Sequence, residues 1–256
     1  MSNSVEPKKT KTNQQQEPVM FGTNMSFAAK EAYKLLRTNL LFSLPEKTEY
    51  RAHIIGVTSS LRGEGKSTTT VNLASTLAEQ GERVLVIEGD MRLPSLHKKI
   101  PIATKPGLSN VLVTRSNLAS FIQVVEVGRV NDIPITFDVL AAGDIPPNPS
   151  ELIGSNRMKR RLEQLAASYH FILLDLPPVT AVTDALVATK LVDGVVMVVR
   201  NGHADSGSLK EAVRQLQLVD ANILGFVYTC AETSHGAYGK KYKYKYQYYS
   251  HYEDRG

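Results

Sequence analysis

The chain has 256 residues, of which 42% are hydrophobic and 21% are charged, and its formal net charge is +5 at pH 7. This length fits one large domain better than two, and the composition is that of an ordinary globular protein. A single cysteine, Cys230, excludes an internal disulfide framework and suits a reducing cytosol. The longest apolar runs, FILL at 171–174 and VVMVV at 195–199, are too short to span a bilayer. The modest positive charge permits acidic partners without identifying them.

The first 25 residues are predicted to form a disordered segment. MSNSVEPKKTKTNQQQEP carries charge but too few apolar residues to offset the entropy of ordering. It also lacks the apolar stretch of a signal peptide. Directly after it, Ser26 is placed to cap a helix over 27–44, in which Ala29, Tyr33 and Leu36 recur at helical spacing.

Short apolar segments alternate with amphipathic ones through the predicted main domain, residues 26–230. We expect strands in HIIGVTSS, RVLVIEGD, ITFDVLAAG, FILLDLPP, GVVMVVR and ILGFVYT, and further helices in TTTVNLASTLAEQ, RMKRRLEQLAAS, TDALVATKLV and SLKEAVRQLQLV. Gly81 is expected to end the first of these further helices. Strands that alternate with helices predict an α/β fold with a mostly parallel sheet flanked by helices on both faces.

The segment SLRGEGKS at 60–67 matches the phosphate-loop pattern G-x-x-x-x-G-K-[ST], except that Ser60 replaces the first glycine. A predicted strand enters it and a predicted helix leaves it, which disfavours an ordinary glycine-rich turn. Its glycines allow main-chain N–H groups to point at phosphate oxygens, the lysine can reach the β- and γ-phosphates, and the serine hydroxyl can bind Mg²⁺. The predicted ATP-binding residues are Arg62, Gly63, Glu64, Gly65, Lys66, Ser67 and Thr68.

Acidic residues end two of the predicted strands. Glu88 and Asp90 follow VLVI, and Asp175 follows FILL. In a parallel sheet these strand ends converge on the crevice beside the phosphate loop. Magnesium prefers one or two carboxylates together with phosphates and water, although aspartate is also common in turns that end strands. The predicted magnesium ligands are Ser67, Glu88, Asp90 and Asp175.

Four segments together resemble the bacterial tyrosine kinases of capsule and exopolysaccharide synthesis: SSLRGEGKST, VLVIEGDMRLPSLH, GDIPPNPSELI and FILLDLPPV. The resemblance covers about residues 26–230 and implies a P-loop ATPase core that phosphorylates protein tyrosine with ATP and Mg²⁺. The family carries D-x-D-x-R after the phosphate-loop helix, where this chain has Glu88, Asp90 and Arg92. It carries D-[ST]-P-P at the second acidic site, where Leu176 takes the hydroxyl position.

The expected catalytic residues are Lys66, Glu88, Asp90 and Asp175. Lys66 is assigned to the phosphates and Asp175, with Ser67, to Mg²⁺. A tyrosine of pKa about 10 is neutral at pH 7, so a proton acceptor helps, and Asp90 is the best candidate. Glu88 is expected to support the metal shell, although the sequence does not exclude an exchange of roles with Asp90.

Residues 231–256 are predicted to form a flexible tail. They hold seven of the eleven tyrosines of the chain: Tyr238, Tyr242, Tyr244, Tyr246, Tyr248, Tyr249 and Tyr252. When extended, the tail is long enough to reach a neighbouring subunit, so we expect it to be the autophosphorylated substrate. A solubilising tail, an edge strand and a nucleic-acid-binding segment are the alternatives. Attached to this ATPase core, the tail is expected to be a substrate, and no nucleic acid is expected as a partner.

The segment EAYKLLR at 31–37 resembles the family's E-x-x-R-x-x-R element, with Lys34 in place of the middle arginine. On a helix, Glu31, Lys34 and Arg37 form one polar strip, which is either a subunit contact or a solvated face. By resemblance the strip joins subunits into a ring of up to eight. The resemblance also implies a cytoplasmic enzyme of the detached Gram-positive type, recruited to the inner face of the membrane by a transmembrane polysaccharide co-polymerase that activates it. A cognate protein-tyrosine phosphatase is the further expected partner.

Two other functions remain open at this point. A partitioning or division-site ATPase is a positional switch that modifies no tyrosine; its loop usually begins K-G-G, and Leu61 stands at the lysine position here. A nucleotide-gated adaptor without enzymatic activity is compatible with Glu88 and Leu176. The tyrosine-rich tail counts against the positional ATPase.

Overall fold

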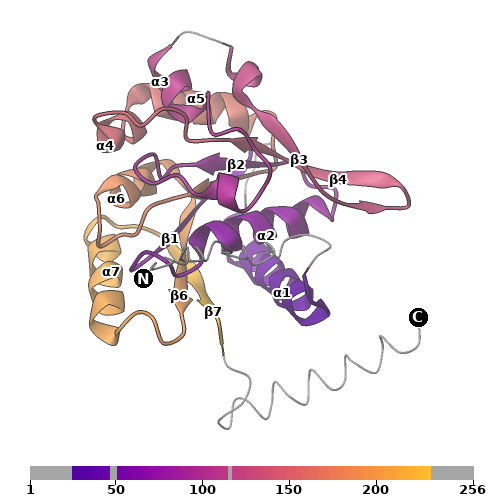
Figure 1. Cartoon of the computed structure of the whole chain (residues 1–256). Coiled ribbons are helices and arrows are strands. Elements are labelled where there is room, and N and C mark those ends of the chain that lie inside the picture. Colours follow the sequence, from indigo (N-terminus) through magenta and orange to yellow (C-terminus); the bar gives the residue numbers. More distant parts are fainter. Residues whose placement is uncertain (1–24, 47–50, 115–116, 232–256) are drawn as a thin grey trace, which may run out of the picture.

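The computed structural model describes residues 25–46, 51–114 and 117–231, which form one seven-stranded sheet with helices on both faces (Figure 1). The strand order is β3-β4-β2-β5-β1-β6-β7. Every neighbouring pair is parallel except β3 and β4, which pair antiparallel at one edge. The predicted α/β fold with a mostly parallel sheet is confirmed.

Six strands match the predicted segments. They are β1 (His53–Ser59), β2 (Val84–Glu88), β4 (Ile133–Leu140), β5 (Phe171–Asp175), β6 (Gly194–Arg200) and β7 (Ile223–Thr229). Every residue of β2 and β5 is buried, in agreement with their continuous apolar sequences. The two acidic strand ends therefore lie in the middle of the sheet, on neighbouring strands.

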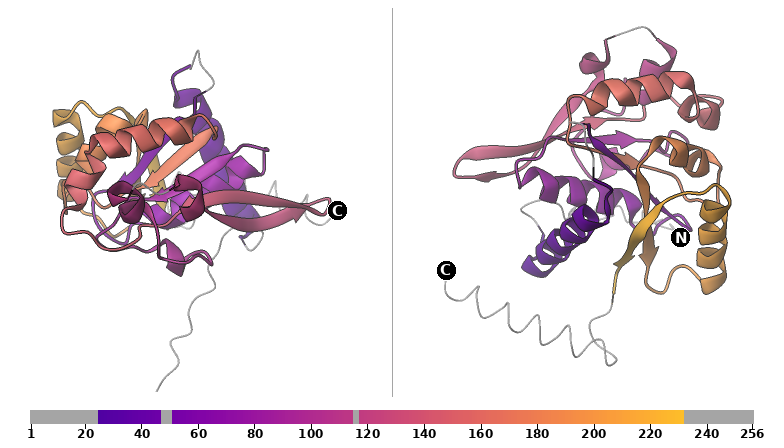
Figure 2. Two further views of the ribbon diagram at one scale, coloured as in Figure 1. Left: turned by 90° about the horizontal axis from the view of Figure 1, so that it is seen from above. Right: turned by 180° about the vertical axis from the view of Figure 1, so that it is seen from behind.

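The seventh strand, β3 (Gln123–Val130), is missed by the sequence analysis. It pairs with β4 through a turn at Asn131 and Asp132, which have φ angles of 49° and 63°. Two-residue turns with positive φ match the twist of a hairpin and favour Asn and Asp. The dipeptide Asn-Asp between two runs that contain valine and isoleucine was therefore the sequence signal for this hairpin. The hairpin projects beyond the rest of the sheet in both views of Figure 2.

The predicted helices are also present, with small changes at their ends. They are α1 (Phe27–Ser43), α2 (Lys66–Ala78), α5 (Asn156–Ala166), α6 (Asp184–Ala188) and α7 (Ser206–Leu218). Two short helices, α3 (Leu108–Val113) and α4 (Pro149–Ile153), and two 3₁₀ turns, η2 (Leu96–Lys98) and η3 (Leu118–Phe121), were not predicted. The segment predicted as one helix in TDALVATKLV divides into α6 and a 3₁₀ turn, η4 (Thr189–Leu191). No helix within the described ranges is long and apolar enough to cross a membrane.

Local signals at two helix ends act as predicted. The Ser26 hydroxyl accepts a hydrogen bond from the Ala29 N–H at 3.3 Å and so caps α1. Gly81 follows α2 with a φ of 81°, a left-handed conformation that favours glycine after a helix. In contrast, α2 begins at Lys66, two residues before the segment predicted as helical, so the phosphate loop runs directly into the first helical turn.

The sheet separates two apolar cores. One contains residues of α1 and α2, and the other contains residues of α3 to α7. Along β2, Val84 and Val86 belong to the α2 side, whereas Leu85 and Ile87 belong to the opposite side. Because successive strand residues point to opposite faces, the next residue, Glu88, faces α2. The same alternation along β5 turns Asp175, the register partner of Glu88, toward α2 as well.

Close contact between two main-chain segments holds the turn before α3. The Leu108 N–H donates to the Ala141 carbonyl at 2.7 Å. A Cβ atom on Gly107 would lie 2.1 Å from the Ala141 oxygen and 2.5 Å from the Gly143 nitrogen. We expect Gly107→Ala to lower the free energy of unfolding by about 1–3 kcal/mol, because main-chain atoms must move to admit the methyl group. Denaturant unfolding measures this change.

The matched control is Gly154→Ala. There the nearest atom to the added Cβ is Val187 Cγ1 at 2.8 Å, on a side chain that can turn away. The control is expected to cost less than Gly107→Ala. Equal losses in the two variants would contradict this account of the turn.

Candidate active site

The phosphate loop, residues 60–67, connects β1 to α2. Gly63 and Gly65 have φ angles of 85° and 97°, the left-handed conformation that glycine adopts without strain. Lys66 and Ser67 begin α2, so the helix N-terminus lies within the loop. This arrangement gives the loop the free N–H groups and the partial positive charge that bind phosphate.

The side chain of Glu64 supports the loop from inside. It is fully buried, and its Oε2 accepts hydrogen bonds from the Leu61 N–H at 2.6 Å and from the Ser60 hydroxyl at 2.9 Å. Its Oε1 accepts from the Arg200 N–H at 3.3 Å. Glu64 was predicted as a nucleotide-binding residue, and its carboxylate points into the loop. Ser60, which replaces the first glycine of the pattern, is part of this support.

Residues distant in sequence also hold the loop from outside. The Arg200 guanidinium donates to the Gly63 carbonyl at 3.2 Å, and a ring nitrogen of His203 lies 2.7 Å from the Arg62 carbonyl oxygen. The Thr229 hydroxyl donates to the Glu64 carbonyl at 2.8 Å. Sequence analysis does not identify these contacts, because carbonyl partners leave no pattern in the sequence. Of the other predicted binding residues, Arg62 is exposed and Thr68 is half-buried in the first turn of α2.

Asp175 and Lys66 bring opposite charges to one buried place. Burial raises the pKa of Asp175 to about 7, against the opposing effects of the Ser67 hydroxyl and the Lys66 ammonium. Burial also lowers the pKa of Lys66, and the charge of Asp175 opposes this shift. One carboxylate oxygen of Asp175, Oδ1, is buried and has no hydrogen-bond partner among the described residues. A buried carboxylate oxygen of this kind fits a magnesium ligand.

Asp90 and Glu88 differ in how their carboxylates are used. Asp90 Oδ1 accepts a hydrogen bond from the Leu93 N–H at 3.0 Å, and burial raises the pKa of this carboxyl. Both oxygens of Glu88 accept main-chain hydrogen bonds, from Ser95, Leu96 and Ala142.

The hydroxyl of Ser67 lies 2.9 Å from that of Ser95, a residue that sequence analysis did not single out. Within the described ranges, no three His, Cys, Asp or Glu side chains gather closely enough to hold a metal by themselves. Magnesium in nucleotide sites usually takes only one or two carboxylates and completes its shell with phosphates and water. Ser67 and Asp175 fit that donor set.

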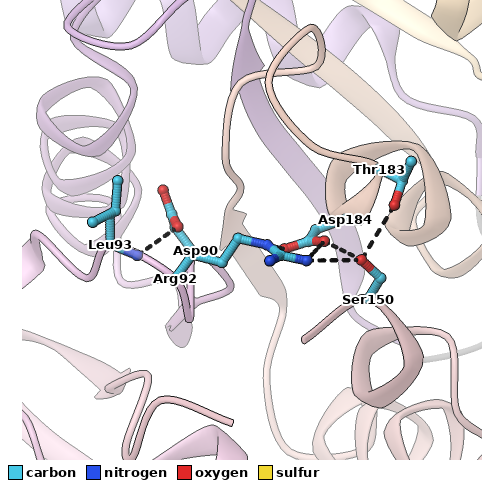
Figure 3. A network of polar contacts seen from close by, with 6 residues as sticks. All are labelled: Asp90, Arg92, Leu93, Ser150, Thr183 and Asp184. Carbon is cyan, nitrogen blue, oxygen red and sulfur yellow. Dashed lines mark hydrogen bonds and ion pairs between the residues drawn. The ribbon is translucent and has the colours of Figure 1, made fainter. Parts of the chain in front are cut away.

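Arg92 fastens the loop after β2 to the opposite side of the sheet (Figure 3). Its Nε donates to Asp184 Oδ2 at 2.9 Å and its Nη2 to Asp184 Oδ1 at 3.1 Å. Asp184 begins α6 and is fully buried, and the Ser150 hydroxyl of α4 donates to the same carboxylate. A bidentate arginine–carboxylate pair of this type holds both groups in one orientation.

Leu176, at the hydroxyl position of the family pattern, lies in the core cluster on the face opposite α2. Its side chain packs so closely on Gly56 and Gly89 that a Cβ atom at either glycine would lie 3.0 Å from a Leu176 methyl carbon. Asp175 faces α2, so Leu176 packs on the other side of the sheet from Asp175. Leu176 therefore affects the site through its packing in the core and not by facing the α2 side, where Asp175 lies.

The predicted subunit strip divides into two parts. Lys34 and Glu31 form an exposed ion pair with 2.7 Å between Nζ and Oε1. Arg37 instead donates to the Thr76 carbonyl near the end of α2, at 2.6 Å, and so joins α1 to the phosphate-loop helix. The seven tail tyrosines lie outside the described residues.

A phosphate loop between a parallel strand and a helix, with acidic strand ends beside it, defines a P-loop nucleotide-binding protein. A family model described as an AAA domain matches residues 52–223. The chain is 32% identical to tyrosine-protein kinase YwqD of Bacillus subtilis (strain 168), over 91% of this chain and 94% of that protein. It is 34% identical to the putative tyrosine-protein kinase CapB of Staphylococcus aureus, over 77% of this chain and 82% of that protein.

The solved kinase domain of the Escherichia coli tyrosine kinase ETK is also similar. It is 29% identical, with a TM-score of 0.74, over 90% of this chain and 86% of that domain. The chain belongs to the bacterial tyrosine-protein kinases. The resemblance stated from the sequence is confirmed, and so is the prediction that the protein is a tyrosine kinase.

Burial of Asp175 makes stability depend on pH. The raised pKa means that the folded state binds this proton more tightly than the unfolded state, where the ordinary value is 3.8. The stabilisation is therefore complete below about pH 4 and is lost as the pH rises through about 7. We expect Asp175→Asn, neutral at every pH, to raise the melting temperature of the nucleotide-free protein at pH 8 and to raise it less at pH 5.

Asp144→Asn is the control for this prediction. The Lys105 ammonium and the Asn110 amide hold the pKa of the exposed Asp144 carboxyl below its usual range, so the control is expected to give no gain at pH 8. A gain for Asp175→Asn that does not depend on pH, or a loss at pH 8, would contradict the raised pKa of the buried Asp175 carboxyl.

Proposed function

We propose that the chain is an ATP-dependent autokinase that phosphorylates its own C-terminal tyrosines and thereby regulates capsular or exopolysaccharide synthesis and export. The observation that carries the proposal is the burial of Lys66 and Asp175 together beside the phosphate loop. Water screens such charges little, so they act strongly on a triphosphate and its metal.

In this proposal the main-chain N–H groups of residues 62–68 and the Lys66 ammonium hold the phosphates of ATP. Ser67 and Asp175 hold the magnesium ion, which neutralises charge on the β- and γ-phosphates when bound. Phosphoryl transfer has a loose transition state, so the main work of these residues is to position the groups and to neutralise charge.

Asp90 receives the proton of the substrate. The tyrosine oxygen forms a bond to the γ-phosphorus while the bond from that phosphorus to the bridging oxygen of ADP breaks, and the phenolic proton passes to the Asp90 carboxylate. Burial raises the pKa of Asp90, which makes its carboxylate a better proton acceptor than an exposed aspartate.

The proposed substrate is the tyrosine cluster at Tyr238, Tyr242, Tyr244, Tyr246, Tyr248, Tyr249 and Tyr252. The position of β7 supports this choice, because Thr229, its last residue, contacts the phosphate loop through Glu64. The chain therefore leaves the folded domain beside the nucleotide site. We propose that the tail of one subunit enters the site of its neighbour.

The proposed assembly is a ring built through α1. Leu35, Leu41 and Phe42 of α1 are large exposed apolar residues, and the side chain of Phe42 is 87% exposed. Apolar side chains on one exposed helix, beside the Glu31–Lys34 pair, fit a subunit contact better than a solvated face. The remaining expected partners are a membrane-spanning co-polymerase that recruits the enzyme to the cytoplasmic side of the membrane and a protein-tyrosine phosphatase.

Lys66→Met tests the kinase assignment. We expect tail tyrosine phosphorylation with ATP and Mg²⁺ to fall by at least about 100-fold, because a lost phosphate-binding charge removes several kcal/mol of transition-state stabilisation. Mass spectrometry of the tail measures the change. Lys159→Met, an exposed lysine on α5, is the control and is expected to keep the activity of the parent. Equal labelling in the parent and in Lys66→Met, or release of phosphate without labelled tyrosine in the parent, would contradict the proposal; the second result is that of a positional ATPase.

Mixing two variants tests transfer between subunits. One carries Lys66→Met with an intact tail, and the other is otherwise unchanged but has phenylalanine at all seven tail tyrosines. Phosphotyrosine on the Lys66→Met chain is expected only in the mixture. Its absence there, while the parent labels itself, would show that each chain modifies its own tail.

A further inference from the structure

We infer that Glu88 is a positioning residue that holds the loop of residues 89–96 by its main chain, and that it does not bind the magnesium ion. The consequence for catalysis rests on the function proposed above, whereas the contact itself does not. The sequence left Glu88 and Asp90 free to exchange roles. The geometry of their hydrogen bonds separates them.

The carboxylate of Glu88 accepts three main-chain hydrogen bonds. Its Oε1 accepts from the Ser95 N–H at 2.5 Å and from the Leu96 N–H at 2.7 Å. Its Oε2 accepts from the Ala142 N–H at 3.2 Å, just after β4. The residue is 1% exposed, so water does not compete for these oxygens. Glu88 thus ties the end of β2 to the end of β4 and to the start of η2.

This use of the carboxylate conflicts with metal binding. A carboxylate that turned toward a metal would leave buried N–H groups without acceptors, which is costly in a protein interior. Asp175, in contrast, has a buried oxygen without a partner among the described residues. The two acids are register partners on neighbouring strands and face the same side of the sheet, yet only Asp175 has a carboxylate oxygen that accepts no hydrogen bond from the described residues.

The length of the side chain matches this role. Aspartate, the residue of the family pattern at this position, is one methylene shorter and would hold its carboxylate nearer to β2. The Ser95 and Leu96 N–H groups lie seven and eight residues along the chain from Glu88, across the loop. Glutamate reaches them.

The loop that Glu88 holds carries much of the proposed chemistry. It includes Asp90, the proposed proton acceptor, and Arg92, which is bonded to Asp184 on the opposite face of the sheet (Figure 3). It also includes Ser95, whose hydroxyl lies 2.9 Å from that of Ser67. Glu88 on the α2 side therefore holds the end of the loop, at Ser95 and Leu96, and Arg92 holds its middle on the α6 side. Release of the Glu88 end is expected to shift Ser95 and Asp90 relative to the phosphate loop.

Glu88→Gln is the variant that tests the inference, because its amide keeps the size of the side chain but places an NH₂ group against at least one of the three donors. Hydrogen–deuterium exchange is measured without nucleotide or metal. We expect the Ser95, Leu96 and Ala142 amides to exchange roughly tenfold faster or more, as charge-assisted hydrogen bonds to buried donors are lost. In the same variant the Mg²⁺ concentration that half-saturates binding of a fluorescent ATP analogue is expected to stay unchanged, while kcat for tyrosine phosphorylation falls.

Asp175→Asn is the matched comparison. It is expected to raise the half-saturating Mg²⁺ concentration and to leave exchange at Ser95 and Leu96 as in the parent. Glu88→Asp gives a second reading should Glu88→Gln fail to fold; it is expected to speed exchange at the same amides without changing the Mg²⁺ requirement. Unchanged exchange at these amides, or a raised Mg²⁺ requirement in either Glu88 variant, would overturn the inference. Hydrogen–deuterium exchange is measured without turnover. A parent protein that phosphorylates no tyrosine would therefore contradict the proposed function, while the exchange data would still test the main-chain contacts of Glu88.

Discussion

The carboxyl edge of the parallel sheet gathers opposite charges where little water can reach them. Lys66 leaves the phosphate loop there and Asp175 ends β5 there, and burial disfavours the charged form of each. The attraction between the two opposite charges offsets part of this cost. In the proposed function, a magnesium–triphosphate complex would bring further negative charge to Lys66 and a divalent cation to Asp175. The buried charges lower the stability of the nucleotide-free protein, and binding of this ligand is expected to offset that loss.

Two buried glutamates, Glu64 and Glu88, prepare the site for that ligand. Each uses its carboxylate to accept main-chain N–H groups of a loop, one within the phosphate loop and the other across the loop after β2. Charged acceptors suit this task, since one carboxylate satisfies several donors at once. The loops are therefore shaped before nucleotide arrives, which lowers the ordering cost of binding.

The sequence predicted the fold and the meeting of Lys66, Ser67 and Asp175 because both follow from strong rules: buried parallel strands are apolar, and their ends converge. It did not distinguish Glu64 and Glu88 from ligands, because a carboxylate in a motif can face either a substrate or the main chain. Contacts of Arg200, Thr229 and Ser95 depend on the tertiary fold. Strand β3 was missed because its half-exposed hairpin pattern is weaker than that of a buried strand, and Arg37 was placed on a surface strip because its distant carbonyl partner leaves no mark on helical spacing.

Calorimetric titration of the free protein with ATP at pH 7 tests whether the buried Lys66 and Asp175 bind a magnesium–ATP complex. The titration is run with Mg²⁺ and with a chelator, each in two buffers of different ionisation enthalpy. The account predicts binding that depends on Mg²⁺ and releases protons, because Asp175, with a pKa of about 7, is partly protonated in the free site and ionises when the metal binds. ATP that binds equally well in the chelator, with no proton released, would contradict it.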